Sequence, residues 1–267
     1  AEPEQILRKL MGERKKLIDG FYGFENLTSH FWIGKSNLDI AGGEPGVIHN
    51  KIILGATWNT LKLAFLSAVI AAVIGIVIAY IAVRRSNNPL AILLDQIAFV
   101  PFLFPTIAFG AMYLTLFAVP VGPIPALYGT FTLLVLISVV SRLPYSVKTG
   151  ITAVTQIGQE LEEAAEVAGA SWWQRFRRII MPLASSGIMS GMMVSFVGVM
   201  RELSLIILLI TPATRVLMTA GFGYAEEGFT QLTNALVLIV ALLTIIGELI
   251  LWKIGKGRMA RLREKQS

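Results

Sequence analysis

The sequence has no cysteine and only two histidines, His30 and His49, among its 267 residues. Disulfide bonds, thiolate metal sites and iron–sulfur clusters are therefore excluded, and a metal centre built on histidine is not expected. Charged residues are also scarce: they make up 15% of the chain, hydrophobic residues make up 55%, and the mean hydropathy is +0.68. Soluble domains have about 25% charged residues. The composition thus favours a protein that lies largely within a lipid bilayer.

A phosphate-binding loop of the form G-x-x-x-x-G-K-[ST] is absent as well. The one Gly-Lys-Ser, at residues 34–36, has Ser29 where the first glycine must stand, and no buried strand precedes it. We therefore expect no nucleotide, metal or cofactor site in this chain, and we do not expect it to be an enzyme.

Five apolar stretches are interpreted as membrane-spanning helices, at residues 61–83, 92–119, 126–140, 188–210 and 232–252. Each is expected to cross a hydrocarbon core of about 30 Å at a rise of about 1.5 Å per residue. Backbone amides have no water to bond in lipid, so only helices are expected at these places. Pro101 and Pro105 predict a kink or break within the second stretch.

Lysine and arginine residues gather on one side of these stretches. Arg84 and Arg85 follow the first stretch, Arg142 and four further basic residues lie between the third and the fourth, and a basic tail follows the fifth. The connections on the opposite side carry only Arg215. Because basic loops stay in the cytoplasm, we expect a multi-pass membrane protein with a cytoplasmic C-terminus. The same placement of the net charge of +6 argues against nucleic-acid binding.

The sequence divides into three parts. Residues 1–50 are polar and are predicted to lie outside the membrane, residues 51–256 to form the transmembrane domain, and residues 257–267 to form a basic cytoplasmic tail. An N-terminal segment with several basic residues fits poorly on the outer side of the membrane, where five spans would place it. We therefore expect at least one more helix, or a whole second half, before residue 1 in the complete protein.

The connection between the third and fourth stretches has the composition of two short helices. Residues 159–168 are mostly strong helix formers, with an apolar stripe of Leu161, Ala164, Ala165 and Ala168 and an acidic side of Glu162, Glu163 and Glu166. Gly169 can take a left-handed turn, and Ser171 and Gln174 have the spacing of a capping box. We expect a helix–turn–helix that either docks on a partner or packs on the helical bundle.

One motif in this connection, within residues 159–182, decides between the two. Its residues are Glu163, Ala164, Ala165, Gly169, Ile179 and Pro182, and they follow the spacing E-A-A-x3-G-x9-I-x-L-P with Met181 at the leucine position. The motif resembles the EAA loop of permease subunits in bacterial binding-protein-dependent ABC importers. The resemblance extends from about residue 59 to the C-terminus. It implies an all-α, type I importer transmembrane domain with about five membrane helices and a cytoplasmic coupling helix, in the bacterial inner membrane.

The resemblance also implies roles and partners. Glu163 would make polar contacts with a separate ATPase subunit, Ala164 and Ala165 would allow close packing against it, and Gly169 would set the turn. The implied partners are two copies of that ATPase, which would bind ATP and Mg²⁺, a second permease half that is identical or fused, and a periplasmic substrate-binding protein. Movement of the ATPases would be passed through this loop to the membrane helices.

Arg201 and Glu202 form the one charged pair in the middle of a predicted span. A charge at that depth costs about 2.5–3.5 kcal/mol, so it normally faces a bundle interior or an aqueous cavity. Adjacent residues of a helix diverge by about 100°, so the two side chains need separate partners. The pair either lines a translocation pathway or pins this helix to its neighbours.

The substrate is suggested by a finer resemblance. Residues 122–130, 201–204 and 211–214 look like the ferric-iron branch of these permeases, and iron would be delivered by the binding protein. Thiamine, phosphonate, polyamine and sulfate or molybdate are the alternatives within the family. From another class, Arg201, Glu202 and the broken second span would also suit an ATP-independent secondary transporter or channel.

Overall fold

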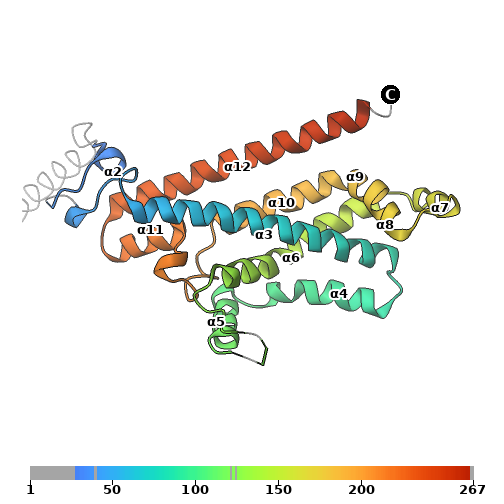
Figure 1. Ribbon diagram of the computed structural model, residues 1–267, viewed down its shortest axis with the longest axis horizontal. Coiled ribbons are helices and arrows are strands. Elements are labelled where there is room, and N and C mark those ends of the chain that lie inside the picture. The colour runs from blue at the N-terminus through green and yellow to red at the C-terminus, as the bar shows by residue number, and fades with distance from the viewer. Residues whose placement is uncertain (1–27, 39–40, 121, 124, 265–267) are drawn as a thin grey trace, which may run out of the picture. The chain divides into compact units, whose positions relative to one another are not determined.

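The computed structural model describes residues 28–38, 41–120, 122–123 and 125–264 (Figure 1). Within these residues all regular secondary structure is helical. The chain divides into two compact units, residues 1–51 and residues 52–267. The basic stretch predicted near the N-terminus lies outside the described residues.

The described part of the first unit consists of short turns of helix. It contains α2 (His30–Ile33) and η2 (Ala41–Gly43). The backbone N–H of Val47 donates to the carbonyl of Phe31 at 2.9 Å and so folds the segment back on itself. None of the described residues before Lys51 belongs to a helix long enough to cross a membrane.

Three helices of the described chain are long and apolar enough to cross a membrane. They are α3 (Lys51–Arg84), α6 (Phe131–Thr155) and the first part of α12 (Thr230–Glu264). The count rises to five if each of two bent helix pairs forms one span. This matches the five predicted spans.

The first bent pair confirms the break that the prolines of the second stretch predict. It consists of α4 (Pro89–Phe99), η3 (Val100–Leu103) and α5 (Thr106–Phe117), with a bend of 107°. Pro101 lies within η3 and Pro105 caps α5, at two points where a proline without an N–H interrupts the helical hydrogen bonds.

The second bent pair joins the connection to the fourth span. After α7 (Glu160–Val167), the chain forms α8 (Trp172–Arg175), the π-helix η4 (Phe176–Ile180), α9 (Met181–Leu183) and α10 (Ser185–Met200), with a bend of 69° before α10. The connection to α12 then contains η5 (Pro212–Thr214) and α11 (Leu217–Glu226).

Two predicted boundaries are wrong. The third span was placed at 126–140 with Arg142 beyond it, but α6 runs to Thr155 and holds Arg142 and Pro144 inside the helix. The fourth span was placed at 188–210, but α10 ends at Met200, and residues 201–210 form turns. The ion pair between Arg142 and Glu202, described below, accounts for both differences. It allows Arg142 to lie inside α6, where the hydropathy pattern ended the span, and it holds Glu202 in the turns after α10, where the pattern continued the helix.

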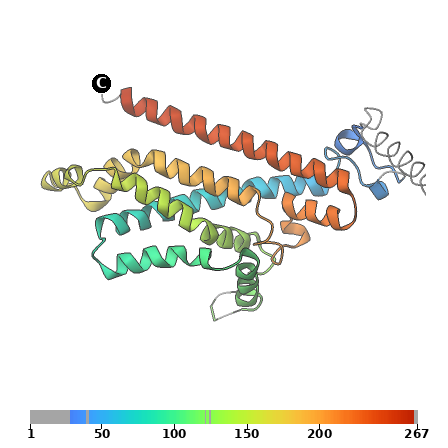
Figure 2. The same cartoon turned by 180° about the vertical axis from the view of Figure 1, so that it is seen from behind.

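Helices α3, α6 and α10 pack closely along their length (Figures 1 and 2). A Cβ atom added to Gly75 of α3 would lie 2.6 Å from the Cβ of Ser146 in α6, and one added to Gly187 of α10 would lie 2.4 Å from that of Ala153. Small residues thus allow the backbones to approach, as is typical of helices in membranes. This packing holds the end of the bundle from which α7 and α8 extend.

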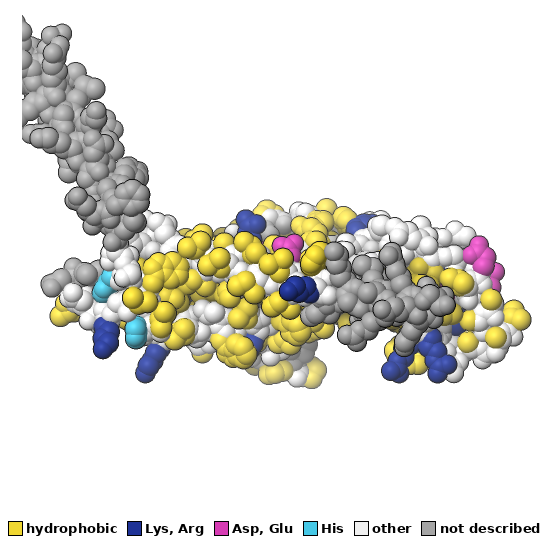
Figure 3. Space-filling view, turned by 90° about the horizontal axis from the view of Figure 1, so that it is seen from above, with side chains coloured by type: hydrophobic (Ala, Val, Ile, Leu, Met, Phe, Trp, Pro, Cys, Tyr) yellow, Lys and Arg dark blue, Asp and Glu magenta, His cyan; other side chains and the backbone are white. Residues whose placement is uncertain are grey.

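Large apolar side chains remain exposed along the long helices. Figure 3 shows hydrophobic side chains over much of one face. Exposed residues of this kind include Val73 in α3, Leu103 in η3 and Ile245 in α12. A contiguous apolar surface of this kind is expected to contact lipid or other subunits and not water.

Candidate functional site

The motif-bearing connection folds into the predicted helix–turn–helix at one end of the bundle (Figure 1). Helix α7 ends at a left-handed glycine, Gly169, with a φ of +82°, and the N–H of Ala170 donates to the carbonyl of Ala165 at 2.9 Å. Ser171 and Gln174 form the predicted capping box at the start of α8. Residues 160–175 are called the hairpin below.

One face of α7 is apolar and exposed. Leu161, Ala164, Val167 and Ala168 are all exposed, and Val167 reaches 92%. Next to this face, Glu163 is also exposed, and its carboxylate accepts a hydrogen bond from Gln159 at 3.0 Å. A helix of small and apolar residues that lies open at the end of a bundle is typical of a docking surface.

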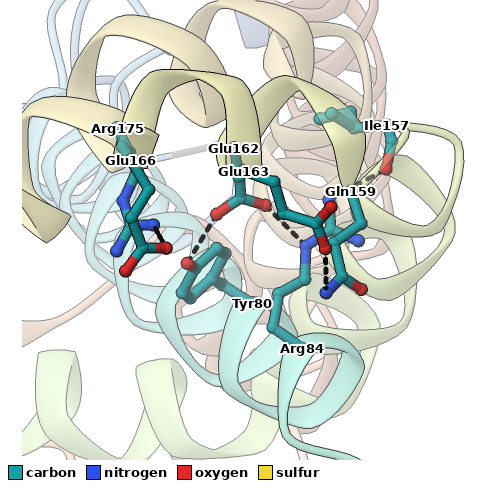
Figure 4. A network of polar contacts seen from close by, with 8 residues as sticks. All are labelled: Tyr80, Arg84, Ile157, Gln159, Glu162, Glu163, Glu166 and Arg175. Carbon is teal, nitrogen blue, oxygen red and sulfur yellow. Dashed lines mark hydrogen bonds and ion pairs between the residues drawn. The ribbon is translucent and has the colours of Figure 1, made fainter. Parts of the chain in front are cut away.

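The opposite face of α7 is anchored by Glu162, which the sequence predicted to lie on the acidic side (Figure 4). Instead Glu162 is 5% exposed. Its Oε2 accepts a hydrogen bond from the hydroxyl of Tyr80 at 2.7 Å, and its Oε1 pairs with Nε of Arg84 at 2.6 Å. Nη2 of Arg84 also donates to the carbonyl of Ile157 at 2.8 Å. Helical periodicity within 159–168 gave no sign of these partners, because they lie in α3.

The second arm of the hairpin packs on the same turn of α3. The ring of Tyr80 contacts that of Phe176 at 5.5 Å in an edge-to-face arrangement, and the ring of Trp172 stacks on Phe176 at 5.4 Å. Arg175 forms an ion pair with Glu166, which joins α8 to α7. Both arms of the hairpin are therefore held at one place.

The last two motif residues lie at the base of the hairpin and not on it. Ile179 is half-buried within η4, and Pro182 stands in the first turn of α9. Proline suits the first turn of a helix, where the missing N–H is not needed. These two residues determine how the chain enters α10, whereas Glu163, Ala164, Ala165 and Gly169 belong to the projecting part.

The predicted intramembrane pair separates into two environments. Glu202 pairs with Nη2 of Arg142 in α6 at 2.5 Å, and both side chains are 13% exposed. Nη2 also donates to the carbonyl of Gly198 at 3.2 Å, while Oε1 of Glu202 accepts from the N–H of Leu205 at 3.1 Å. Arg201 is exposed and makes no hydrogen bond or ion pair with the described residues. Sequence reasoning missed Arg142 as the partner, because it placed that residue in the loop.

A cavity of about 340 Å³ lies beside this ion pair. Its walls are formed by the break of the second span (Phe104, Pro105 and Thr106), by Arg142 and Tyr145 of α6, and by Glu202 after α10. A broken helix and buried charges at one cavity are typical of a substrate path through a membrane protein. The described residues contain no cluster of three or more His, Cys, Asp or Glu side chains that could hold a metal ion.

Comparison with known proteins identifies the family of the chain. Residues 71–254 match the family described as binding-protein-dependent transport system inner membrane component. The chain is 30% identical over 173 residues to the sulfate transport system permease protein CysT of Escherichia coli, covering 60% of each chain. It is 27% identical over 212 residues to the ferric transport system permease protein FbpB of Actinobacillus pleuropneumoniae, covering 78% of this chain and 30% of that one. The sequence therefore spans less than two thirds of either relative.

A solved structure has the same fold. It is a bacterial alginate ABC transporter in complex with a periplasmic protein that holds an alginate pentasaccharide. The TM-score is 0.66 and the identity 16%, over 93% of both chains.

Proposed function

Because this chain belongs to the family of inner membrane components of binding-protein-dependent transport systems, we propose that it forms the translocation pathway of an ATP-driven solute importer. It is an all-α, multi-pass transport protein with the fold of ABC transporter membrane subunits. The observation on which the proposal depends is the hairpin, which projects from one end of the bundle and exposes an apolar face on which a partner subunit could dock.

In this proposal α7 is the helix that a separate ATPase subunit grips. The exposed methyl of Ala164 lets another backbone approach, Glu163 offers a carboxylate to a basic group, and Gly169 permits the sharp turn. Ala165 is half-buried, and its carbonyl accepts the hydrogen bond that closes the turn at Gly169, so it contributes more to that turn than to the contact with the ATPase. Ile179 and Pro182 hold the base of the hairpin at the entry to α10. Binding and hydrolysis of ATP with Mg²⁺ would occur on the partner.

The remaining partners follow from the family and from orientation. Two ATPase copies would act on this chain and on a second permease half, identical or fused, and a periplasmic binding protein would deliver the solute. The proposed orientation places the hairpin in the cytoplasm. Because α12 runs towards the end of the bundle where the hairpin lies (Figure 1), its basic C-terminal part would also be cytoplasmic.

The proposed pathway passes the cavity beside Arg142 and Glu202. Arg201 is exposed, and an arginine within a membrane bundle faces water or another subunit and not lipid. We therefore place Arg201 on the same pathway, where this chain would face the second permease half. For the substrate we propose ferric iron, because residues 201–204 and 211–214 resemble ferric permeases. The sulfate relative makes an oxyanion the principal alternative.

The test is reconstitution of the complete importer in proteoliposomes, with uptake of labelled ferric iron and of sulfate measured with and without ATP. Replacement of Glu163 by Lys should weaken ATPase binding about tenfold, because a charge contact becomes repulsive. Glu160→Lys makes the same change at an exposed residue of the same helix and should have a much smaller effect. Solute uptake that continues with an ATPase unable to hydrolyse ATP would favour a secondary transporter or channel instead.

A further inference from the structure

The hairpin is attached to α3 by side chains as well as to α6 and α10 by the chain itself. The two chain connections differ: residues 156–159 form turns, whereas α8 continues through the π-helix η4 into α9 before the 69° bend ahead of α10. By contrast, Tyr80 and Arg84 stand one helical turn apart on α3 and donate three hydrogen bonds to Glu162 and Ile157. The side chains of α3 therefore fix the hairpin to the membrane domain at a point that the chain connections do not provide.

Glu162 differs from the other acidic residues of α7. Both of its carboxylate oxygens are bonded and the residue is buried, whereas Glu160, Glu163 and Glu166 are exposed. A buried carboxylate whose partners are all on one helix strongly resists movement relative to that helix, since separation would leave a charge unpaired out of water. This residue therefore has a different task from the exposed carboxylate of the motif.

The other end of α3 is bonded to the segment that follows the fourth span. The hydroxyl of Thr60 accepts a hydrogen bond from the N–H of Leu217 at 2.8 Å, and the amide of Asn59 donates to the carbonyls of Ala213 and Arg215 at 3.2 and 3.0 Å. Thr60 and Tyr80 are separated by about 30 Å at the rise of a helix. Helix α3 thus connects the hairpin to η5 and the start of α11 on the opposite side of the bundle.

We propose that Tyr80, Arg84 and Glu162 form a latch that makes the hairpin and α3 one rigid body. ATPase-driven movement of α7 is then delivered through α3 to residues 211–217, and these three residues position the hairpin without touching ATP or solute. The inference rests on the proposed function, in which α7 is the helix moved by the ATPase.

Breaking the latch should uncouple the importer without preventing its assembly. In proteoliposomes with the ATPase and the binding protein, Glu162→Gln is expected to leave ATPase association and hydrolysis intact, and to lower the uptake per ATP hydrolysed about tenfold. Glu160→Gln removes an exposed carboxylate from the same helix and is the matched control. The exchange of Arg84→Glu with Glu162→Arg should restore part of the ratio. An unchanged ratio in Glu162→Gln would overturn the latch.

A second measurement tests the latch without the importer. The chain has no cysteine, so spin labels can be attached at Val73→Cys in α3 and Val167→Cys in α7, both of which are exposed. In nanodiscs holding the full chain, the distance distribution between the labels should be narrow, and it should broaden with Glu162→Gln but not with Glu160→Gln. Equal widths in all three would refute the rigid body. Failure of ATP-dependent uptake in the wild type would refute the proposed function but leave this result standing.

Discussion

Two buried ion pairs among the described residues look alike and differ in how fully their buried groups are bonded. Arg84 and Glu162 join α3 to the hairpin at 2.6 Å, and Arg142 and Glu202 join α6 to the turns after α10 at 2.5 Å. At both pairs the carboxylate accepts a second hydrogen bond, from Tyr80 or from the N–H of Leu205, and the guanidinium also donates to a carbonyl. Cavities also adjoin both, since Tyr80 lines one of about 390 Å³ and Arg142 and Glu202 line one of about 340 Å³. The pairs differ at Nε of Arg142, which is buried and has no hydrogen-bond partner among the described residues.

This difference suggests different tasks. A polar network whose buried groups are all bonded is rigid, whereas one with a buried, unsatisfied donor can rearrange when another group arrives. The first pair therefore suits transmission of movement, and the second suits a pathway whose charges are free to exchange partners with a passing solute.

The largest effect is expected from removing half of the membrane pair. Arg142→Ala leaves the carboxylate of Glu202 buried within the helical bundle without its cationic partner, which should lower the free energy of unfolding by about 3–5 kcal/mol. The double variant Arg142→Met with Glu202→Leu should recover most of that stability but not solute uptake. Unfolding in mixed SDS micelles and uptake in proteoliposomes measure the two quantities. A double variant that transports normally would remove the pair from the pathway.

A smaller loss is expected at the cytoplasmic pair. Arg84→Ala leaves Glu162 with the hydrogen bond from Tyr80 and, in the proposed orientation, at the cytoplasmic end and not in the middle of the bilayer, so the loss should be about 1–3 kcal/mol. Arg85→Ala, at the exposed neighbouring arginine, should change stability little. A larger loss of stability in Arg84→Ala than in Arg142→Ala, under the same micelle conditions, would contradict the expected order of the two pairs.

The sequence predicts the features that depend on local chemistry. Prolines at 101 and 105 locate the break between α4 and α5, and the glycine at 169 has the positive φ that its place after α7 suggested. The capping box of Ser171 and Gln174 also forms as its spacing predicts. In each case the decisive residues stand within a few positions of the feature that they determine.

Both ion pairs escaped prediction because their partners are distant in sequence. Arg142 looked like the end of a span, since a lone charge is unfavourable in lipid, but Glu202 compensates it from 60 positions away. The carboxylate of Glu202 also accepts a hydrogen bond from the N–H of Leu205, just after α10 ends at Met200. The helix ends there although the following residues are apolar enough to continue a span. Helical periodicity alone likewise placed Glu162 on the acidic side of its helix, because Tyr80 is 82 positions away in the sequence.

A backbone substitution in the hairpin separates coupling from stability. Gly169→Val forces a β-branched residue into a left-handed conformation and should cost about 1–2 kcal/mol locally. Gly228→Val, between α11 and α12, is an equivalent change, because both glycines have a positive φ and open space around the missing Cβ. Hydrogen exchange should report a similar local loss at both turns. Only Gly169→Val should reduce ATP-dependent uptake, and equal uptake in the two variants would argue against a coupling role for the hairpin.

The smallest effect on stability is expected at Arg201, next to the membrane pair. Its exposed side chain bonds no described residue, so Arg201→Gln should leave unfolding in SDS unchanged, in contrast to any substitution of Glu202. If the arginine faces the pathway, uptake should still fall severalfold, and Arg201→Lys should preserve it because the charge remains. Adjacent residues would then differ in their effects: substitutions of Glu202 would change both stability and uptake, while substitutions of Arg201 would change uptake alone. Normal uptake by Arg201→Gln would restrict the pathway to the cavity beside Arg142 and Glu202.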